Sequence, residues 1–269
     1  MLKINLILIL LIIYLIYLNQ CFFFTKENFV NTNILDISIC VACYPPHLNR
    51  IKNLLDSINI GSTYPKDCII GLSETNSSEA KLIEDEFNKK YNFKIIITPS
   101  EKKCNQSENR NRAFELSNSK YITINDADDI VHKDRLKIIF DIMEKTDCKA
   151  LLHSYISPNN LEKKIDLYSN NWDLPKKYEI KSSEELYEIA EKTKNITLHF
   201  VPLATHGYIT FKKTILNDIK QNILFDNNNN NNNFKQMGED SIFARDILKK
   251  FGKTNSLLFY NIQLLKYIE

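Results

Sequence analysis

The stretch from Tyr121 to Asp129 reads YITINDADD and decides how the rest of the sequence is interpreted. Residues 121–124 are of strand-forming types and run directly into an acidic cluster that contains Asp126, Asp128 and Asp129. Open α/β sheets bind their ligands where strands end, so the position of the cluster indicates a site. If the chain stays extended, Asp126 and Asp128 lie on one side of it and both carboxylates reach the same cation.

The cluster by itself supports two interpretations. Carboxylate oxygens are suitable ligands for a divalent cation, which would neutralise a diphosphate and act as a Lewis acid toward a leaving nucleoside diphosphate. Alternatively, the acidic residues belong to the first turn of the next helix and are stabilised by its macrodipole. The surrounding sequence has to decide between the two.

Strand patterns and helix patterns alternate on both sides of this stretch. The expected strands are residues 37–41, 68–72, 93–97 and 121–124, and the expected helices are residues 48–58, 80–87, 109–116 and 136–142. This alternation predicts an α/β fold with a mostly parallel, Rossmann-like sheet flanked by helices.

The second half of the sequence is less regular. We expect a strand at residues 151–155, a helix from Ser182 to about Lys192, extended chain at residues 200–211 and a final helix from about Asp240 to Gly252. Residues 227–233 are seven consecutive asparagines, which cannot pack a core, so we expect a disordered insertion there.

The N-terminus predicts a membrane anchor. Leu6 to Leu18 is uninterrupted Leu, Ile and Tyr, and Ile4 to Phe24 has about the length that a membrane-spanning helix needs. A cleavable signal peptide is the alternative, but no small-x-small cleavage site follows. We therefore expect a transmembrane anchor at residues 1–24, a linker at residues 25–36 and one catalytic domain at residues 37–269.

Charge suggests the orientation and excludes one class of partner. Lys3 and the terminal amine precede the apolar span and favour a cytoplasmic N-terminus, hence a single-pass type II protein with a lumenal domain in a Golgi-like or ER-like compartment. Lys and Arg number 35 against 33 Asp and Glu, a net charge of +2. That balance is not the footprint of a nucleic-acid-binding protein.

Six cysteines show neither a metal-binding spacing nor a disulfide framework. Cys40 and Cys43 match C-x-x-C, but they fall on an expected strand, where residues three apart point to opposite faces. We therefore interpret them as buried packing residues and not as a redox or zinc site.

Three further segments complete a pattern with the acidic stretch. Residues 38–44 read SICVACY and precede it, as do residues 110–113, which read RNRA, whereas residues 238–240 read GED and follow it by about a hundred positions. In this order the segments resemble the family 2 glycosyltransferases of the GT-A fold, and the resemblance runs from about Ile37 to the C-terminus.

The resemblance implies a set of donor-binding residues. Tyr44 would stack on the nucleobase of a nucleotide sugar, and Arg110 and Asn111 would approach the donor. Asp126 and Asp129 would contact it at the acidic motif. The sugar would be a hexose or an N-acetylhexosamine, and the acceptor would be a glycan, a protein or a lipid.

The resemblance also implies how transfer is catalysed. Asp126 and Asp128 would bind Mn²⁺ or Mg²⁺, and Glu239 and Asp240 match the Glu-Asp pair whose Asp is the general base of inverting members. Asp240 would accept the acceptor's hydroxyl proton as that oxygen attacks the anomeric carbon.

Each of these residues also has a purely structural interpretation. Tyr44 can pack beside the two prolines that follow it, Arg110 can be a surface cation, and helix starts attract carboxylates such as Glu239 and Asp240. The conjunction of the motifs in the family's order favours the functional interpretation.

The sequence departs from the family pattern in one place that matters for the donor. The family commonly has Asp-Asp-Gly-Ser after its second strand, and this chain has SETN at residues 73–76, so Glu74 would take the base-recognition role. This departure motivates an alternative function, a non-catalytic GT-A relative that binds sugar or nucleotide.

Two further interpretations stay open or are disfavoured. His206 and Gly207 are either contacts to the acceptor or to a phosphate, or part of an ordinary loop. A phosphohydrolase with an aspartyl nucleophile would place its D-x-D motif after the first core strand, whereas three expected strands precede the motif here.

Overall fold

The computed structural model describes residues 33–156, 169–174, 180–182, 209–219, 243, 247 and 257–266. Contacts divide the chain into Met1–Ile34 and Leu35–Glu269, and the elements below concern the second unit. Within the described ranges, no helix is long and apolar enough to cross a membrane. The expected anchor at residues 1–24, most of the linker and the asparagine run lie outside these ranges.

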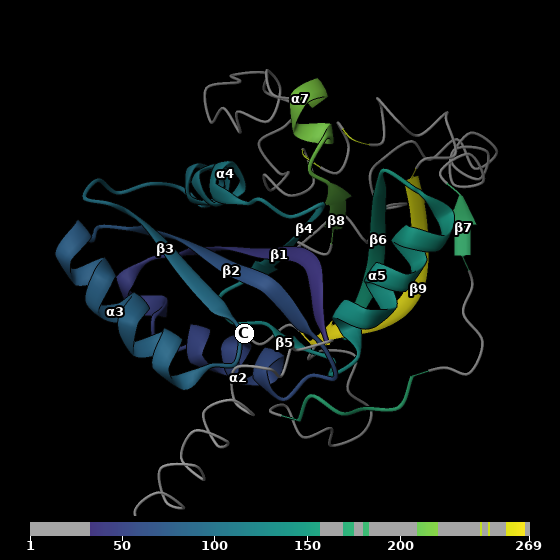
Figure 1. The fold of residues 1–269 in the computed structure, drawn as a ribbon, viewed down its shortest axis with the longest axis horizontal. Coiled ribbons are helices and arrows are strands. Elements are labelled where there is room, and N and C mark those ends of the chain that lie inside the picture. Colours follow the sequence, from purple (N-terminus) through teal and green to yellow (C-terminus); the bar gives the residue numbers. More distant parts are fainter. Residues whose placement is uncertain are drawn as a thin grey trace, which may run out of the picture. The chain divides into compact units, whose positions relative to one another are not determined.

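Strands and helices alternate through the first half of the domain (Figure 1). The strands are β1 (Ile34–Cys43), β2 (Tyr64–Ser73), β3 (Lys94–Ser100), β4 (Tyr121–Asp126), β5 (Ile130–Val131), β6 (Ala150–Ile156), β7 (Ile180–Ser182), β8 (Ile209–Lys212) and β9 (Leu257–Lys266). The helices are α2 (Ile51–Asn59), α3 (Ser77–Lys90), α4 (Gln106–Leu116), α5 (Arg135–Thr146) and α7 (Ile215–Ile219), with a 3₁₀ turn, η1, at Pro45–His47.

The sheet has the order β3-β2-β1-β4-β8-β6-β9-β5, and β7 also pairs with β9. The pairs β2–β3, β1–β4 and β6–β9 are parallel, as the alternation of strands and helices predicts. The strand β8 runs antiparallel between β4 and β6, and β5 and β7 run antiparallel to β9. The expected α/β fold with its parallel strands is confirmed, and the antiparallel pairs are additions to it.

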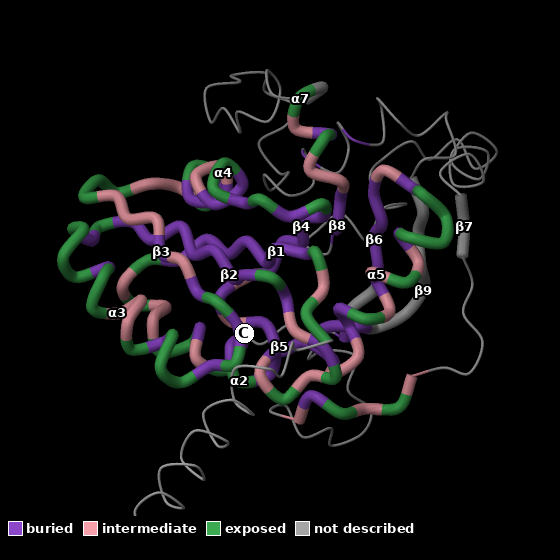
Figure 2. Tube along the Cα trace, in the orientation of Figure 1, coloured by how far each residue is buried: buried purple, intermediate pink, exposed green. Residues whose placement is uncertain are grey.

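Strand alternation sends the side chains of β1 into two separate hydrophobic layers. Ile37, Ile39, Val41 and Cys43 join a core with the buried faces of α2, α3 and α5, whereas Cys40 joins a second core with α4 and α7. Figure 1 shows α2 and α3 on one side of the first strands and α4 on the other, and Figure 2 shows β1 and β2 buried along most of their length. The sheet is therefore the middle of three layers.

Several boundaries in the second half differ from expectation. The strand β9 and the short strands β5 and β7 were not expected, and Ser182 ends β7, with the helix expected after it outside the described residues. Phe243 and Ile247 are helical and buried, which agrees with the final helix at those two positions. Only residues 209–211 of the expected extended segment are described, and they are strand.

The start of α3 is fixed by a capping box. The side chain of Asn76 accepts a hydrogen bond from the backbone N–H of Glu79 at 2.9 Å, and the Glu79 carboxylate accepts one from the backbone of Asn76 at 3.4 Å. The helix α4 begins in the same way, with Asn105 and Glu108. Because these side chains satisfy amides that a helix start leaves unpaired, they fix where α3 begins after β2 and where α4 begins after β3.

The helix α4 crosses β2 at Gly71, where the two backbones approach closely. A Cβ atom at Gly71 would lie 2.1 Å from the carbonyl oxygen of Asn109 and 2.6 Å from its carbonyl carbon. Both are backbone atoms, so no side-chain rotation relieves the clash. Glycine at this position therefore sets how close α4 lies to the sheet.

We expect Gly71→Ala to lower the free energy of unfolding by about 1–3 kcal/mol, because the added methyl group pushes α4 off β2. Guanidinium denaturation measures the loss. Leu82→Ala is the control, since Leu82 is 71% exposed on α3 and its truncation should change stability by less than about 0.5 kcal/mol. Equal losses in the two variants would contradict the packing role of Gly71.

The C-x-x-C pair occupies opposite faces of β1, as expected. Cys40 lies in the core under α4 and Cys43 in the core under α2, and burial raises the pKa of the Cys43 thiol to about 12. Two thiols on opposite faces of a strand cannot hold one metal ion or close a disulfide. Their role is packing.

Thiol labelling tests this interpretation. In a Cys21→Ser background at pH 8, Ellman's reagent should modify Cys104 rapidly, because Cys104 is the only partly exposed cysteine among those described. The remaining described cysteines should react only after unfolding: Cys40, Cys43, Cys68 and Cys148. Rapid modification of two or more thiols in the folded protein would argue against burial of the pair.

Candidate active site

The site residues from the first half of the chain gather at the carboxyl ends of three neighbouring strands. Tyr44 follows β1, Glu74 follows β2, and Asp126 ends β4. Ala42 pairs with Asp126 in the parallel register of β1 and β4, so Tyr44 and Asp126 leave the sheet at the same edge. This is the edge at which open α/β sheets bind ligands.

The acidic motif forms a turn and not an extended segment. The backbone N–H of Asp129 donates to the carbonyl of Asp126 at 3.3 Å, and Asp128 lies inside this turn. We expected strand alternation to bring Asp126 and Asp128 to one side. This reason is wrong, because the strand ends at Asp126 and does not continue to Asp128. The turn, and not the pleat, fixes their relative position.

Asp129 holds the turn together from inside. Its Oδ2 accepts hydrogen bonds from the backbone N–H of Asp126 at 2.8 Å and from the Asn125 amide at 3.3 Å, and the side chain is fully buried. Burial, together with the neighbouring Asp126 charge, raises the pKa of the Asp129 carboxyl well above its usual range. The structure thus places Asp129 beneath the site, where it orders the backbone of Asp126.

Asp126 is fixed by a buried ion pair with α4. The Arg110 guanidinium Nη2 lies 2.5 Å from Asp126 Oδ1, and the Arg110 side chain is 0% exposed against 14% for Asp126. Arg110 is thus not a surface cation. Its position depends on how closely α4 packs against the sheet, because Asn109, the residue before Arg110, lies where α4 meets Gly71.

Asp128 has a different arginine partner. Arg50, just before α2, places Nη1 3.2 Å from Asp128 Oδ2, and the two side chains are 52% and 17% exposed, respectively. An exposed pair of this kind contributes little to stability. The two aspartates therefore differ, since one is locked by a buried arginine and the other is balanced by a solvent-exposed one.

A buried polar network supports the end of β4 from the side of α5. Arg135 donates to Asn125 Oδ1 at 3.0 Å, to Thr123 Oγ1 at 2.8 Å and to His153 Nε2 at 3.0 Å. Asn125 in turn binds Asp129, so Arg135 orients the acidic turn through one intermediate. No motif in the sequence pointed to Arg135.

Asn109 is a second residue that the sequence patterns missed. Its amide donates to the Cys43 carbonyl at 3.2 Å and lies 3.5 Å from Ser73 Oγ, so it joins the ends of β1 and β2 to α4. Arg112 fixes the amide by donating to its oxygen at 2.6 Å. The loops that carry Tyr44 and Glu74 are thereby held to the helix that carries Arg110.

Tyr44 and Glu74 are both presented to solvent at this edge. Tyr44 is 40% exposed, and its ring centroid lies 4.0 Å from that of His47 in η1. Glu74 is exposed and has a left-handed φ of 54°, and its N–H donates to the Lys102 carbonyl at 3.2 Å. A left-handed glutamate is unfavourable, so the backbone of this turn is held by its surroundings.

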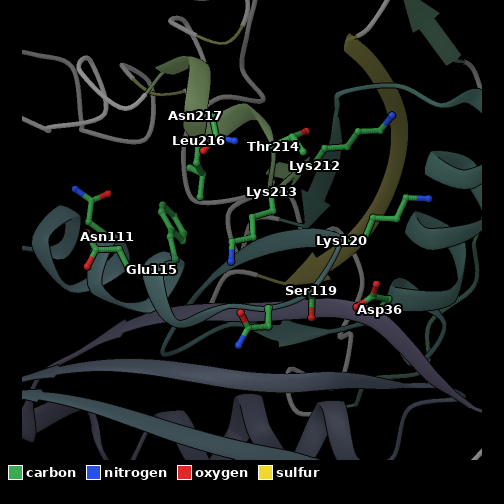
Figure 3. A pocket seen from close by; sticks show the side chains of 12 residues that line it. Asp36, Asn111, Glu115, Ser119, Lys120, Lys212, Lys213, Thr214, Leu216 and Asn217 are labelled. Atoms are coloured by element: carbon green, nitrogen blue, oxygen red, sulfur yellow. The ribbon is translucent and has the colours of Figure 1, made fainter.

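Among the described candidate residues, only Asn111 lines a cavity of about 940 Å³ between α4 and residues 212–217. This cavity also reaches Asp36 and Lys120, which lie near the amino ends of β1 and β4 (Figure 3). The remaining candidates, Glu239, Asp240, His206 and Gly207, lie outside the described residues. Their roles stay predictions.

The acidic turn suits a divalent cation that a substrate helps to hold. Asp126 Oδ2 and Asp128 Oδ1 have no hydrogen-bond partner within the described ranges, and carboxylate oxygens suit Mg²⁺ and Mn²⁺. No cluster of three or more ligating side chains occurs among the residues that the structure describes. Two carboxylates completed by water and substrate phosphates are a usual set of ligands for Mg²⁺, so the residues present fit such an ion.

The fold and the acidic turn at a strand end define a type of α/β protein that binds its ligands at the carboxyl ends of the strands. Residues 38–220 match the description Glycosyl transferase family 2, and the chain belongs to this family. It is 31% identical over 120 residues to an uncharacterized glycosyltransferase of Methanocaldococcus jannaschii. The aligned residues are 45% of this chain and 41% of that relative.

Solved structures show the same fold. TarS 1–349 of S. aureus in complex with UDP-GlcNAc superposes with a TM-score of 0.57 at 14% identity, covering 87% of this chain and 58% of that one. The complex of the same protein with UDP superposes with a TM-score of 0.54 at 17% identity, covering 86% of this chain and 60% of that one. The chain therefore has a mixed α/β, Rossmann-like GT-A fold, and it spans less than two thirds of the length of these neighbours.

The two aspartates should respond differently to loss of charge. Asp126→Asn removes the carboxylate from the buried Arg110 guanidinium, so we expect it to lower the free energy of unfolding by up to about 3 kcal/mol. Asp128→Asn removes only an exposed pair, and we expect a change below about 1 kcal/mol. Guanidinium denaturation in EDTA measures the free energy of unfolding of both variants without any contribution from a metal. Equal losses would contradict the difference in burial between the Arg110 pair and the Arg50 pair.

Proposed function

We propose that this chain is a metal-dependent glycosyltransferase that moves a sugar from a nucleoside-diphosphate donor to an acceptor hydroxyl with inversion. The observation that carries the proposal is the meeting of Tyr44, Arg110, Asp126 and Asp128 at one edge of a GT-A sheet in a family 2 chain. The complexes of a structural neighbour with UDP-GlcNAc and UDP support a uridine nucleotide as the first donor to try.

The donor would span the edge from β2 to β4. The exposed Tyr44 ring offers a face for the nucleobase, and the Glu74 carboxylate offers acceptors for its N–H groups. The diphosphate then lies toward the acidic turn, where Asp126 and Asp128 would hold Mg²⁺ or Mn²⁺. The bound ion supplies Lewis-acid stabilisation of the leaving diphosphate.

The protein's own groups prepare this turn for that task. The Arg110 guanidinium holds Asp126 in one orientation, and Asp129 fixes the backbone between the two carboxylates. Because the protein's own groups make these contacts, little reorganisation is needed when the donor arrives. Pre-organisation of this kind is what positions a reacting phosphate and anomeric carbon.

Proton transfer is assigned to Asp240, with Glu239 beside it, on the resemblance of residues 238–240 to the family's Glu-Asp pair. Asp240 would accept the acceptor's hydroxyl proton while that oxygen attacks the anomeric carbon from the side opposite the leaving diphosphate. The configuration at the anomeric carbon is thereby inverted. His206 and Gly207 would contact the acceptor or a phosphate.

The proposed setting is a membrane. Residues 1–24 would anchor the enzyme as a single-pass type II protein, with the catalytic domain in a Golgi-like or ER-like lumen that supplies nucleotide sugars. A hexosyl or N-acetylhexosaminyl group is proposed for transfer to a glycan, protein or lipid.

A panel of UDP- and GDP-sugars, with and without Mn²⁺, tests the proposal on the purified full-length chain. We expect metal-dependent donor binding and slow donor hydrolysis, with Asp128→Asn losing both. Asp240→Asn should keep donor affinity within about twofold and lose turnover by a factor of about 10²–10⁴, the usual contribution of a general base. Asp141→Asn is the control, because among the described residues Asp141 pairs only with Lys137, on the exposed face of α5.

The second candidate function is a binding protein without turnover. The turn at residues 73–76 favours it, because Glu74 and Thr75 replace the residues that the family commonly has there. Tight binding of a donor, with no hydrolysis or transfer under any metal condition, would establish this alternative. An equal loss of donor affinity in Asp128→Asn and Asp240→Asn would remove the assigned role of Asp240.

A further inference from the structure

Arg50 and Asp128 form a contact between the segment after β1 and the acidic turn. The guanidinium Nη1 lies 3.2 Å from Asp128 Oδ2, and within the described part of the chain this is the only side-chain hydrogen bond or ion pair of either residue. Tyr44 and Arg50 belong to the same short segment, which runs through η1 into α2. One segment thus carries both the exposed aromatic ring and a cation at the metal-binding turn.

Helix stability does not explain an arginine at this position. Arg50 is the N-cap of α2, and its side chain makes no capping hydrogen bond. The amino end of a helix carries a partial positive charge, so a cation there is unfavourable unless an anion balances it. Asp128 provides that anion here.

The neighbouring pair shows what a permanent contact looks like in this site. Arg110 and Asp126 are nearly excluded from water, whereas Arg50 is 52% exposed and its pair with Asp128 is the looser one. A half-exposed arginine can leave its partner at little cost, because water solvates the guanidinium wherever it moves. The Arg50 contact is therefore suited to exchange.

We propose that Arg50 is an exchangeable counter-ion of Asp128 that passes to the donor diphosphate when a divalent cation binds. This rests on the proposed function. Without metal, the guanidinium neutralises the Asp128 carboxylate and competes with any cation for it. A divalent cation at Asp128 repels the guanidinium, whose planar set of N–H donors matches two phosphate oxygens.

Arg50 thereby couples two binding steps. Metal binding displaces a cation that donor binding then uses, so each ligand favours the other, and the coupling is reciprocal. The predicted direction of the change in metal affinity distinguishes this role from a structural one. Removing the Arg50 charge should strengthen metal binding in the absence of a nucleotide and weaken nucleotide binding in the presence of metal, a reversal that a merely structural residue would not produce.

Mn²⁺ titration followed by electron paramagnetic resonance measures the first step on the full-length protein without nucleotide. We expect Arg50→Gln to bind Mn²⁺ up to about fivefold more tightly than the wild type, the limit set by an exposed pair. Arg50→Lys keeps the charge and should bind Mn²⁺ as the wild type does. Lys52→Gln is the matched control, because Lys52 lies on α2, is similarly exposed, and faces Glu86 away from the turn.

Calorimetry with UDP at saturating Mn²⁺ measures the second step. Both Arg50→Gln and Arg50→Lys should weaken UDP binding by about tenfold, because neither keeps the bidentate contact to phosphate. In an Asp128→Asn background, Arg50→Gln should no longer strengthen Mn²⁺ binding, since no carboxylate remains to be released.

The possible results separate this inference from the proposed function. If the wild type binds Mn²⁺ and UDP but Arg50→Gln leaves the Mn²⁺ affinity unchanged or weakens it, the counter-ion role is wrong and the glycosyltransferase proposal stands. If the wild type binds neither Mn²⁺ nor any nucleotide, the proposed function itself fails. Opposite changes in the two affinities in Arg50→Gln, absent from Lys52→Gln, would support the exchange.

Discussion

The buried ion pair between Arg110 and Asp126 joins α4 to the end of β4, and the geometry of the candidate site depends on it. Breaking an ion pair that is nearly excluded from water carries a penalty, so the contact with Arg110 disfavours any turning of Asp126 away from α4. The pair also fixes where the acidic turn begins. The hydrogen bond from the backbone of Asp126 to Asp129 then holds the turn closed.

The pair is possible only because of how α4 lies on the sheet. Gly71 lets the helix backbone approach β2, and Asn109 uses this closeness to bond the Cys43 carbonyl and reach Ser73. The small residue Gly71 therefore lets α4 reach the ends of β1 and β2. The packing of α4 on β2 and the Arg110–Asp126 pair are thus linked, so a substitution that shifts α4 would also move Arg110 relative to Asp126.

The sequence predicted the elements whose signals are local, and missed those that depend on distant partners. Alternating apolar patterns located β1 to β4 and their helices, and the C-x-x-C pair fell on opposite faces as expected. The strand β9 pairs with β6, more than a hundred residues earlier, so nothing near Leu257 announces it. Likewise, Asp128 lies in a turn that a buried carboxylate creates, and neither Arg50 nor Arg135 belongs to a motif that pointed to the turn.

The two arginines divide the work of an acidic site in a physically sensible way. Carboxylates gathered in one turn repel each other, so a folded protein has to balance their charges. A buried arginine does this for Asp126 through Oδ1 and gives the turn one shape. The exposed Arg50 balances Asp128 weakly, and a weak contact is the only kind that a ligand can replace without unfolding part of the site.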